Sequence, residues 1–229
     1  MKIWCRYWYD FGLIPAGLTV ILMIIFWNDM EVLSRIAVLN FVALCIHQFE
    51  EYSRPGGMAY IMNQMQKQLN MPVFHFKEDT KTDRYPLNQF NAMLGNCFVV
   101  YVVYLLPVFF PNVFILGFAP IVFGLVFQVV MHCILANIKM GCLYNPGMGA
   151  ALLGHVPIGI YHFWYINSTG LASVKNIVSG IFYFIAIIII FMLLTYKVFA
   201  NQENDYPFSQ EEIDRGEKFA RKHFKKYKL

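Results

Sequence analysis

The stretch CIHQFEEY, residues 45–52, closes an apolar run that begins near Val32. On a helix, His47 lies three residues before Glu50 and four before Glu51, so the three side chains share one face. An imidazole and two carboxylates at the edge of a bilayer are costly unless they pair, bind a metal or reach water. The stretch therefore predicts that a membrane-spanning helix ends in a functional site.

The composition of the whole chain indicates a membrane setting. Of its 229 residues, 58% are hydrophobic and only 14% are charged, whereas about 25% of the residues in a soluble domain are charged. The length accommodates about six spans of roughly 20 residues with short loops. We therefore predict an all-α, polytopic membrane helical bundle with about six transmembrane helices, surrounded by membrane lipid and without a nucleic-acid partner.

Apolar runs separated by polar turns give the positions of the predicted spans. Their approximate ranges are 11–27, 32–47, 90–110, 113–136, 144–166 and 174–199. The one long loop, about 52–88, includes a Met-rich stretch, 58–69. Its apolar spacing predicts a short helix that lies at the interface, covers a site or is simply packed within the loop. Residues 1–200 thus form the predicted transmembrane domain.

The remaining residues, 201–229, are polar and largely basic. Ser209 and Glu212 have the spacing of a capping box. Apolar residues recur at helical spacing after it, at Ile213, Ala220, Phe224 and Tyr227. We predict a cytoplasmic, basic amphipathic tail that either lies on an anionic membrane surface or simply keeps this end of the chain in solution.

The distribution of positive charge predicts the orientation. If the N-terminus is cytoplasmic, all of the 18 Lys and Arg residues except Arg35 and Lys175 lie on the cytoplasmic side. Such a bias is typical of the inner loops of membrane proteins, so both termini are predicted to be cytoplasmic. The aromatic and Met content fits a protein of the bacterial inner membrane.

In this orientation, four consecutive spans carry polar side chains toward the cytoplasmic face. They are His47, Glu50, Glu51, Asn91, Asn96, His132, Asn137, Tyr144 and Asn145, with His155 about three turns deeper. Short loops favour neighbouring helices, so we expect these spans to form one pocket.

The residue types in this set point to a metal site. His47, Glu50, Glu51 and His132 supply two imidazoles and two carboxylates, a ligand set that suits a divalent metal such as zinc or iron. In the simplest arrangement Glu50 or Glu51 remains free as a general base, so both are candidate catalytic residues.

The other polar residues are candidates for supporting roles. They can orient ligands or hold an oxyanion, and they are Asn91, Asn96, Asn137, Tyr144, Asn145 and His155. Asn96 and Asn137 can instead make interhelical hydrogen bonds, Asn145 can cap a helix, and His155 can be a packing residue. Asn91 and Asn96, and likewise His132 and Asn137, are five residues apart, which on an α-helix is about 140°. Neither pair is therefore expected to face a single point without distortion of the helix.

The motif His47-x-x-Glu50-Glu51 resembles that of the HXXEE domain family of integral membrane proteins. The resemblance extends over most of residues 40–165. It includes the Pro-Gly-Gly at 55–57, the Asn-containing start of the third span, His132 with Asn137, and the Tyr-Asn-Pro-Gly at 144–147. The family is functionally uncharacterised, so the resemblance implies that these residues act as a set but does not imply a reaction.

A second resemblance is to the CAAX-type intramembrane proteases, which cleave with a glutamate. Glu50 and Glu51 precede Arg54 as in their Glu-Glu-Arg motif, but with two intervening residues in place of three. Phe127 precedes His132 as in their second motif, but with four intervening residues in place of three.

These observations lead to three functional hypotheses. The first is a membrane-embedded, metal-dependent enzyme of hydrolase or oxidoreductase type that acts on a lipid or amphiphilic substrate at the cytoplasmic leaflet. The second is a non-enzymatic polytopic protein, either a transporter or a regulator. The third is a metal-free glutamyl protease of the CAAX type. The sequence leaves the oligomeric state open.

Overall fold

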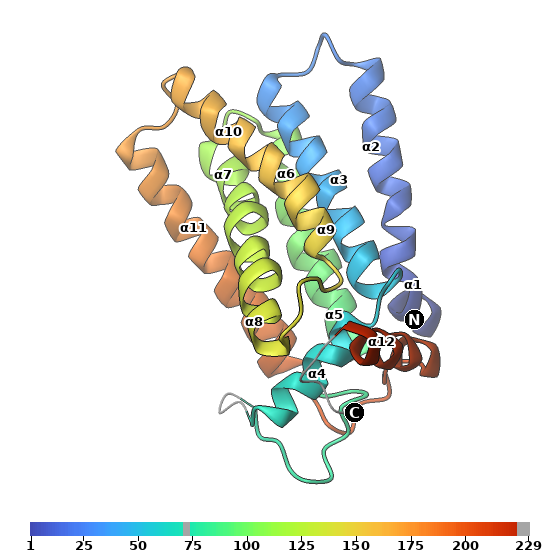
Figure 1. The fold of residues 1–229 in the computed structure, drawn as a ribbon. Helices are drawn as coiled ribbons and strands as arrows, with labels where there is room; N and C mark the ends of the chain where they lie inside the picture. Colours follow the sequence, from blue (N-terminus) through green and yellow to red (C-terminus); the bar gives the residue numbers. More distant parts are fainter. Residues whose placement is uncertain (71–73, 224–229) are drawn as a thin grey trace.

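The computed structural model describes residues 1–70 and 74–223. Within these residues the chain forms eight helical segments and no strand, which confirms the all-α prediction. Five segments are long and apolar enough to cross a membrane, namely Lys2–Ile25, Val32–Tyr52, Gln89–Phe109, Phe114–Met140 and Val174–Val198. They stand together as an upright bundle (Figure 1).

Several of these segments combine shorter elements end to end. The first joins α1 (Lys2–Phe11) to α2 (Leu13–Ile25), and the second is α3 (Val32–Tyr52) alone. The third comprises α5 (Gln89–Leu94), η1 (Gly95–Tyr101) and α6 (Val102–Phe109); the fourth comprises α7 (Phe114–Val122), η2 (Phe123–Ala136) and α8 (Asn137–Met140). The fifth consists of α11 (Val174–Leu193) and η4 (Leu194–Val198).

One further long segment runs beside α3 and α7 (Figure 1). It comprises α9 (Met148–Ala150), η3 (Ala151–His155) and α10 (Val156–Ser168). This segment was expected to be a span, but it is not among the five that meet the length and hydropathy criteria. His155 and His162 lower its hydropathy, although it extends over the same height of the bundle as its neighbours.

The element η2 is a π-helix of 14 residues. A π-helix has i→i+5 hydrogen bonds and is wider than an α-helix. Pro120, near the end of α7, lies just before it, and a proline removes one donor from the α-helical ladder. Because the turn is wider, residues five apart in η2 lie closer to one face than they would on an α-helix.

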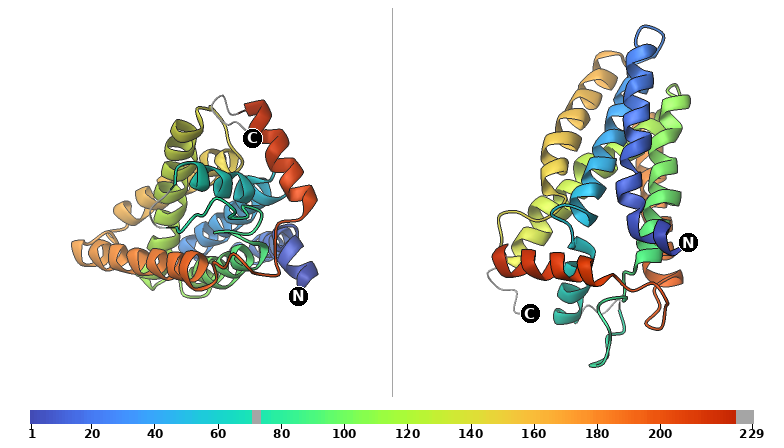
Figure 2. Two further views of the ribbon diagram at one scale, coloured as in Figure 1. Left: turned by 90° about the horizontal axis from the view of Figure 1, so that it is seen from below. Right: turned by 90° about the vertical axis from the view of Figure 1, so that its right-hand side faces the viewer.

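Two shorter helices form a layer across the lower end of the bundle, where the N-terminus also lies (Figure 2). These are α4 (Met58–Gln68), which fulfils the prediction for the Met-rich stretch, and α12 (Gln210–His223). Their apolar sides meet in one cluster with the end of the fourth segment, made of Met58, Ile61, Met65, Ala136, Met140, Phe219 and Ala220. The apolar face of α12 is therefore covered by protein.

The start of α12 agrees with the capping box expected from the sequence. The N–H of Ser209 donates to Glu212 Oε2 at 2.7 Å, and the N–H of Glu212 donates to Ser209 Oγ at 3.4 Å. Phe224 and Tyr227, which were expected to continue the apolar face, lie outside the described residues.

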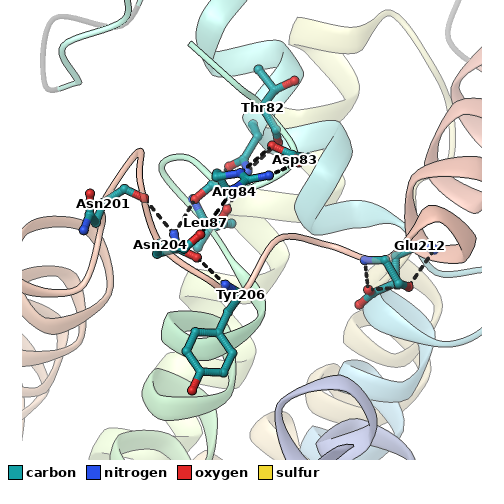
Figure 3. A network of polar contacts seen from close by, with 10 residues as sticks. Thr82, Asp83, Arg84, Leu87, Asn201, Asn204, Tyr206 and Glu212 are labelled. Carbon is teal, nitrogen blue, oxygen red and sulfur yellow. Dashed lines mark hydrogen bonds and ion pairs between the residues drawn. The ribbon is translucent and has the colours of Figure 1, made fainter. Parts of the chain in front are cut away.

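Hydrogen bonds join the long loop before α5 to the segment before α12 (Figure 3), at the end of the bundle that is lowest in Figure 1. Asn204 Nδ2 donates to the carbonyl of Arg84 at 3.2 Å, and Arg84 Nη1 donates to the carbonyl of Asn204 at 3.3 Å. The N–H of Phe208 donates to the carbonyl of Asp83 at 2.7 Å. These bonds position α12 against α4 and over the lower end of α3.

Replacing Gly57 with alanine is expected to lower the free energy of unfolding by about 1–3 kcal/mol. Gly57 has a φ of +81°, and a Cβ there would overlap the backbone of Gly216 in α12. Gly170→Ala is the matched control, because its φ is +74° but its Cβ would meet nothing within 4 Å. Thermal unfolding in detergent should show the larger loss for Gly57→Ala, and equal losses would contradict the contact with α12.

Candidate metal centre

Two histidines and one glutamate meet in the lower half of the bundle. His47 and Glu51 come from the last turns of α3 and His132 comes from η2. One ligand atom from each lies within 4.8 Å of the others. Glu51 Oε1 is 3.2 Å from His132 Nε2, and Glu51 Oε2 is 3.6 Å from His47 Nε2. Both imidazoles are buried, whereas the side chain of Glu51 is 18% exposed.

The hydrogen bonds of Asn145 fix the tautomer of His132. Asn145 Nδ2 donates to the carbonyl of His132 and to Asn137 Oδ1, both at 2.7 Å. This orients the amide so that its Oδ1, 2.7 Å from His132 Nδ1, is an acceptor. His132 Nδ1 must therefore carry the proton, and in the neutral ring Nε2 presents a lone pair toward Glu51.

A backbone carbonyl fixes His47 in the same way. His47 Nδ1 donates to the carbonyl of Gly147 at 2.8 Å, since a carbonyl can only accept. Gly147 has a φ of +102°, and a Cβ there would lie 2.6 Å from Cε1 of His132 and 2.9 Å from Cγ of Glu51. Only glycine leaves room for the cluster at this position.

The resulting arrangement brings three electron-pair donors together. His47 Nε2 is buried and has no hydrogen-bond partner, and both Nε2 atoms face oxygens of an acidic side chain. Such a group is unfavourable in a buried setting unless a proton or a cation lies between the atoms. Imidazoles whose second ring nitrogen donates to an oxygen are the usual form of histidine ligands. The donor set thus fits a divalent metal.

Glu50 does not join this group. Its Oε1 accepts from the hydroxyl of Tyr144 at 2.5 Å and from the N–H of Gly149 at 3.0 Å, and its Oε2 accepts from the N–H of Ala150 at 2.7 Å. Adjacent residues of a helix diverge by about 100°, so Glu50 faces the start of α9 while Glu51 faces the histidines. A carboxylate is stabilised there by the amides and the dipole of the helix N-terminus.

Tyr144 completes this second arrangement. Burial raises the pKa of Tyr144, and the hydrogen bond to Glu50 and the charge of Glu50 raise it further. The phenol therefore keeps its proton and acts as a donor to the carboxylate.

The structure brings some of the expected supporting residues to the cluster and leaves others apart. Asn137 and Asn145 belong to its hydrogen-bond network, as described above. Asn96 accepts from Gln48, the neighbour of His47, at 3.0 Å. Asn91 forms a capping box with Asn88 and donates to the carbonyl of Thr195 at 2.8 Å, so its bonds serve the start of α5.

His132 and Asn137 face one point, and they do so through the helix distortion that this requires. Both contact Asn145, His132 through Nδ1 and Asn137 through Oδ1. The physical reason is the π-helix η2, in which a spacing of five residues nearly closes one turn. Hydropathy did not reveal this winding, and Pro120 was its only signal in the sequence.

His155 lies behind the cluster and has a partner that the sequence analysis missed. Its ring centroid is 5.9 Å from that of His47, and its Nδ1 is 2.9 Å from Asn40 Oδ1. Asn40 is 2% exposed in the middle of α3. A lone amide in the middle of an apolar span was the available signal, because a polar group there needs a partner.

Comparison with known proteins gives one match. The family described as "Protein of unknown function with HXXEE motif" matches residues 38–162, which include the whole cluster and Glu50. The resemblance seen in the sequence is thereby confirmed. No curated protein and no solved structure matched the chain.

Replacing Glu50 with glutamine is expected to lower the free energy of unfolding by about 2 kcal/mol. In the wild type, three donors bind the two carboxylate oxygens of Glu50. A glutamine has only one acceptor oxygen, so its NH2 group would face at least one of these donors and leave it without an acceptor. Thermal unfolding in detergent measures the change, and Glu78→Gln in an exposed loop is the control. An unchanged melting temperature for Glu50→Gln would exclude the anchoring role.

Proposed function

The chain belongs to the family of proteins of unknown function with an HXXEE motif, and we propose that it is a membrane-embedded, metal-dependent enzyme acting on a lipid or amphiphile. The metal ligands would be His47, Glu51 and His132. The single observation that carries the proposal is the convergence of two tethered imidazoles on one carboxylate in a buried setting.

The ligand set narrows the type of chemistry. Two imidazoles and one carboxylate with open positions are found at hydrolytic zinc sites and at non-haem iron sites of oxygenases. A divalent metal at such a site polarises a bound water or a substrate oxygen. The zinc case corresponds to a hydrolase and the iron case to an oxidoreductase, so the identity of the bound metal separates the two.

The chain's own residues have distinct roles in this proposal. Asn145 and the carbonyl of Gly147 hold the two rings with Nε2 toward the ligand. Glu50 and Tyr144 hold the start of α9 beside the site. Because both carboxylate oxygens of Glu50 accept hydrogen bonds from protein donors, Glu51 is the carboxylate that we assign to the metal.

A substrate from the bilayer fits the surroundings of the site. Ile138 and Leu143, on either side of the turn that leads to Asn145, are 70% and 91% exposed, and Leu153 in η3 is 84% exposed. Apolar side chains so exposed beside a polar centre suit a surface that faces acyl chains. A lipid could then present its polar part to the metal while its tail stays in the membrane.

The topology that we propose places this site at the cytoplasmic leaflet. The segment 148–168 would be a sixth span, which gives six transmembrane helices in residues 1–200, cytoplasmic termini and a cytoplasmic tail in residues 201–229. Two observations support this topology. Positive charge is concentrated toward the lower end of the bundle, and the segment 148–168 runs alongside the five candidate spans (Figure 1). The aromatic and Met content fits a bacterial inner membrane.

The alternative functions have less support. A glutamyl protease needs a glutamate that is free to activate water, whereas Glu50 is engaged by three donors and Glu51 faces two imidazoles. A transporter or regulator would bind the metal without converting a substrate. Conversion of a lipid therefore distinguishes the enzyme from a transporter or regulator.

Purified protein is expected to contain about one divalent metal ion per chain. His132→Ala and His47→Ala should each remove it, and Asn145→Ala should weaken binding by about 10–100-fold because His132 loses its orienting partner. Elemental analysis and competition with a chelating dye measure both effects. His75→Ala, in an exposed loop, is the control. A wild-type protein that contains no metal after purification without chelators, and takes up none on addition, would contradict the proposal.

Wild-type protein in vesicles of total lipid extract is expected to convert at least one lipid class, and Glu51→Gln is expected to abolish this conversion. The substitution removes the charge between the histidines while keeping nearly the same volume. Mass spectrometry of the lipids before and after incubation detects the products. Metal binding without any lipid change in the wild type would favour the transporter or regulator.

Reporter fusions are expected to place both termini in the cytoplasm. With six spans, fluorescent fusions at either end should fold in the cytoplasm, and alkaline phosphatase inserted after Gly170 should be active outside. If the segment 148–168 did not span, the two termini would lie on opposite sides of the membrane.

A further inference from the structure

A pocket of about 530 Å³ lies at the lower end of the bundle, between α1, the end of α3 and the start of α12. The first turn of α12 and the N-terminal helix α1 lie close together there (Figure 2). Phe49 is one of the residues that line the pocket. It lies two residues before Glu51, which on a helix is about 200° away. The pocket therefore lies on a different side of α3 from the candidate metal centre.

The charged residues that line this pocket are two arginines and two acids, Arg54, Arg215, Asp10 and Glu211. Glu211 has partners of its own, because its Oε2 is 2.8 Å from Nη2 of Arg6 and its Oε1 is 3.7 Å from Nη1 of Arg215. Within residues 1–70 and 74–223, neither the guanidinium of Arg54 nor the carboxylate of Asp10 has a hydrogen bond or an ion pair. The pocket thus contains one positive and one negative group that are free to bind a ligand.

The second arginine, Arg215, is fixed by the close approach of two backbones. A Cβ on Gly57 would lie 2.3 Å from the backbone nitrogen of Gly216 and 3.0 Å from the carbonyl carbon of Arg215. The side chain of Arg215 is 25% exposed, and its Nε is buried without a hydrogen-bond partner among the described residues. A buried donor on a charged group is unfavourable without an acceptor. An anion bound by this guanidinium would supply the acceptor.

An apolar stripe runs from the pocket along α2. Ile14, Leu18 and Ile21 follow Asp10 at intervals of four, four and three residues, so they share its face of the segment Lys2–Ile25. Their exposed fractions are 61%, 55% and 54%. On a segment long enough to cross a membrane, such a face suits contact with acyl chains. The stripe therefore favours a ligand that has a polar head in the pocket and apolar tails beside α2.

We propose that this pocket binds the headgroup of a zwitterionic phospholipid that carries a phosphate and a primary ammonium. The phosphate accepts hydrogen bonds from Arg54 and Arg215, because the planar fork of a guanidinium matches phosphate oxygens. The ammonium donates to the carboxylate of Asp10. The bound lipid then links α1, the end of α3 and α12 at the lower face, and its binding does not involve the metal.

The negative charge of Asp10 separates this lipid class from others with the same phosphate. A headgroup without an ammonium would place its phosphate in a pocket where Asp10 stays unpaired, and like charges in one binding site are unfavourable. A quaternary ammonium has no N–H to donate to the carboxylate. The pocket is therefore expected to prefer phosphatidylethanolamine to phosphatidylglycerol and to phosphatidylcholine.

The test measures lipid binding by the complete protein in detergent, kept metal-free with a chelator. Native mass spectrometry gives the affinities for the three lipids with identical acyl chains, and phosphatidylethanolamine should bind about 10-fold more tightly than the other two. Arg54→Gln should weaken its binding by about 10-fold, because a charged hydrogen bond to the phosphate is lost. Lys81→Gln removes a positive charge from an exposed loop outside the pocket and should leave the affinity unchanged.

Asp10→Asn tests the ammonium contact separately and should remove the preference for phosphatidylethanolamine over phosphatidylglycerol. Asp79→Asn, in an exposed loop, is its control and should keep this preference. The proposal is overturned by a wild type without the preference, by undiminished binding in Arg54→Gln, or by a preference that persists in Asp10→Asn. Displacement of the lipid by an equal concentration of O-phosphoethanolamine would assign the pocket to a soluble phosphate ester instead. None of these results depends on the proposed enzyme, because no metal is present and no lipid is converted.

Discussion

The geometry of the candidate metal centre depends on two hydrogen bonds that turn the protonated ring nitrogens of both histidines away from Glu51. His47 and His132 each donate Nδ1–H to an oxygen, the carbonyl of Gly147 and Oδ1 of Asn145, at 2.8 and 2.7 Å. Each neutral ring must then turn an unprotonated Nε2 toward Glu51. In a buried, largely apolar setting such an arrangement is costly unless a cation or a proton joins the three groups. The remaining features of the site hold the carbonyl oxygen of Gly147 and Oδ1 of Asn145 in place.

The short connection between the fourth and the next long segment supplies both oxygens. Asn145 is held by Asn137 and by the carbonyl of His132, and Gly147 adopts a positive φ that brings its carbonyl to His47. Glu50 then fixes the following helix by accepting from its first amides. The two glutamates of the motif therefore have different roles. Glu51 faces the histidines, while Glu50 holds the helix that carries the connecting loop.

Buried polarity is distributed unevenly along the bundle. Around the candidate metal centre most polar atoms of the described residues have a partner, and the exceptions include Nε2 of His47, Nε2 of His155 and Oε1 of Gln48. Toward the upper end, Tyr104 and His162 have polar atoms without partners around a cavity large enough for water. Since a membrane offers no water to compensate such groups from outside, the two regions suggest different ligands, a cation in one and water in the other.

The sequence alone determined the helical class, the long apolar segments with their approximate bounds, and the motif His47-x-x-Glu50-Glu51, because hydropathy and helical spacing are local properties. It also selected His132 and Asn145 as members of the site. Only the tertiary structure decided that Glu51 faces the histidines and Glu50 does not, since this depends on where the start of α9 lies. It also decided that Asn91 serves as a cap, that Asn40 supports His155, and that Asn137 and His132 reach one amide. The last point follows from the π-helical winding of η2, which residue spacing on an ideal α-helix cannot reveal.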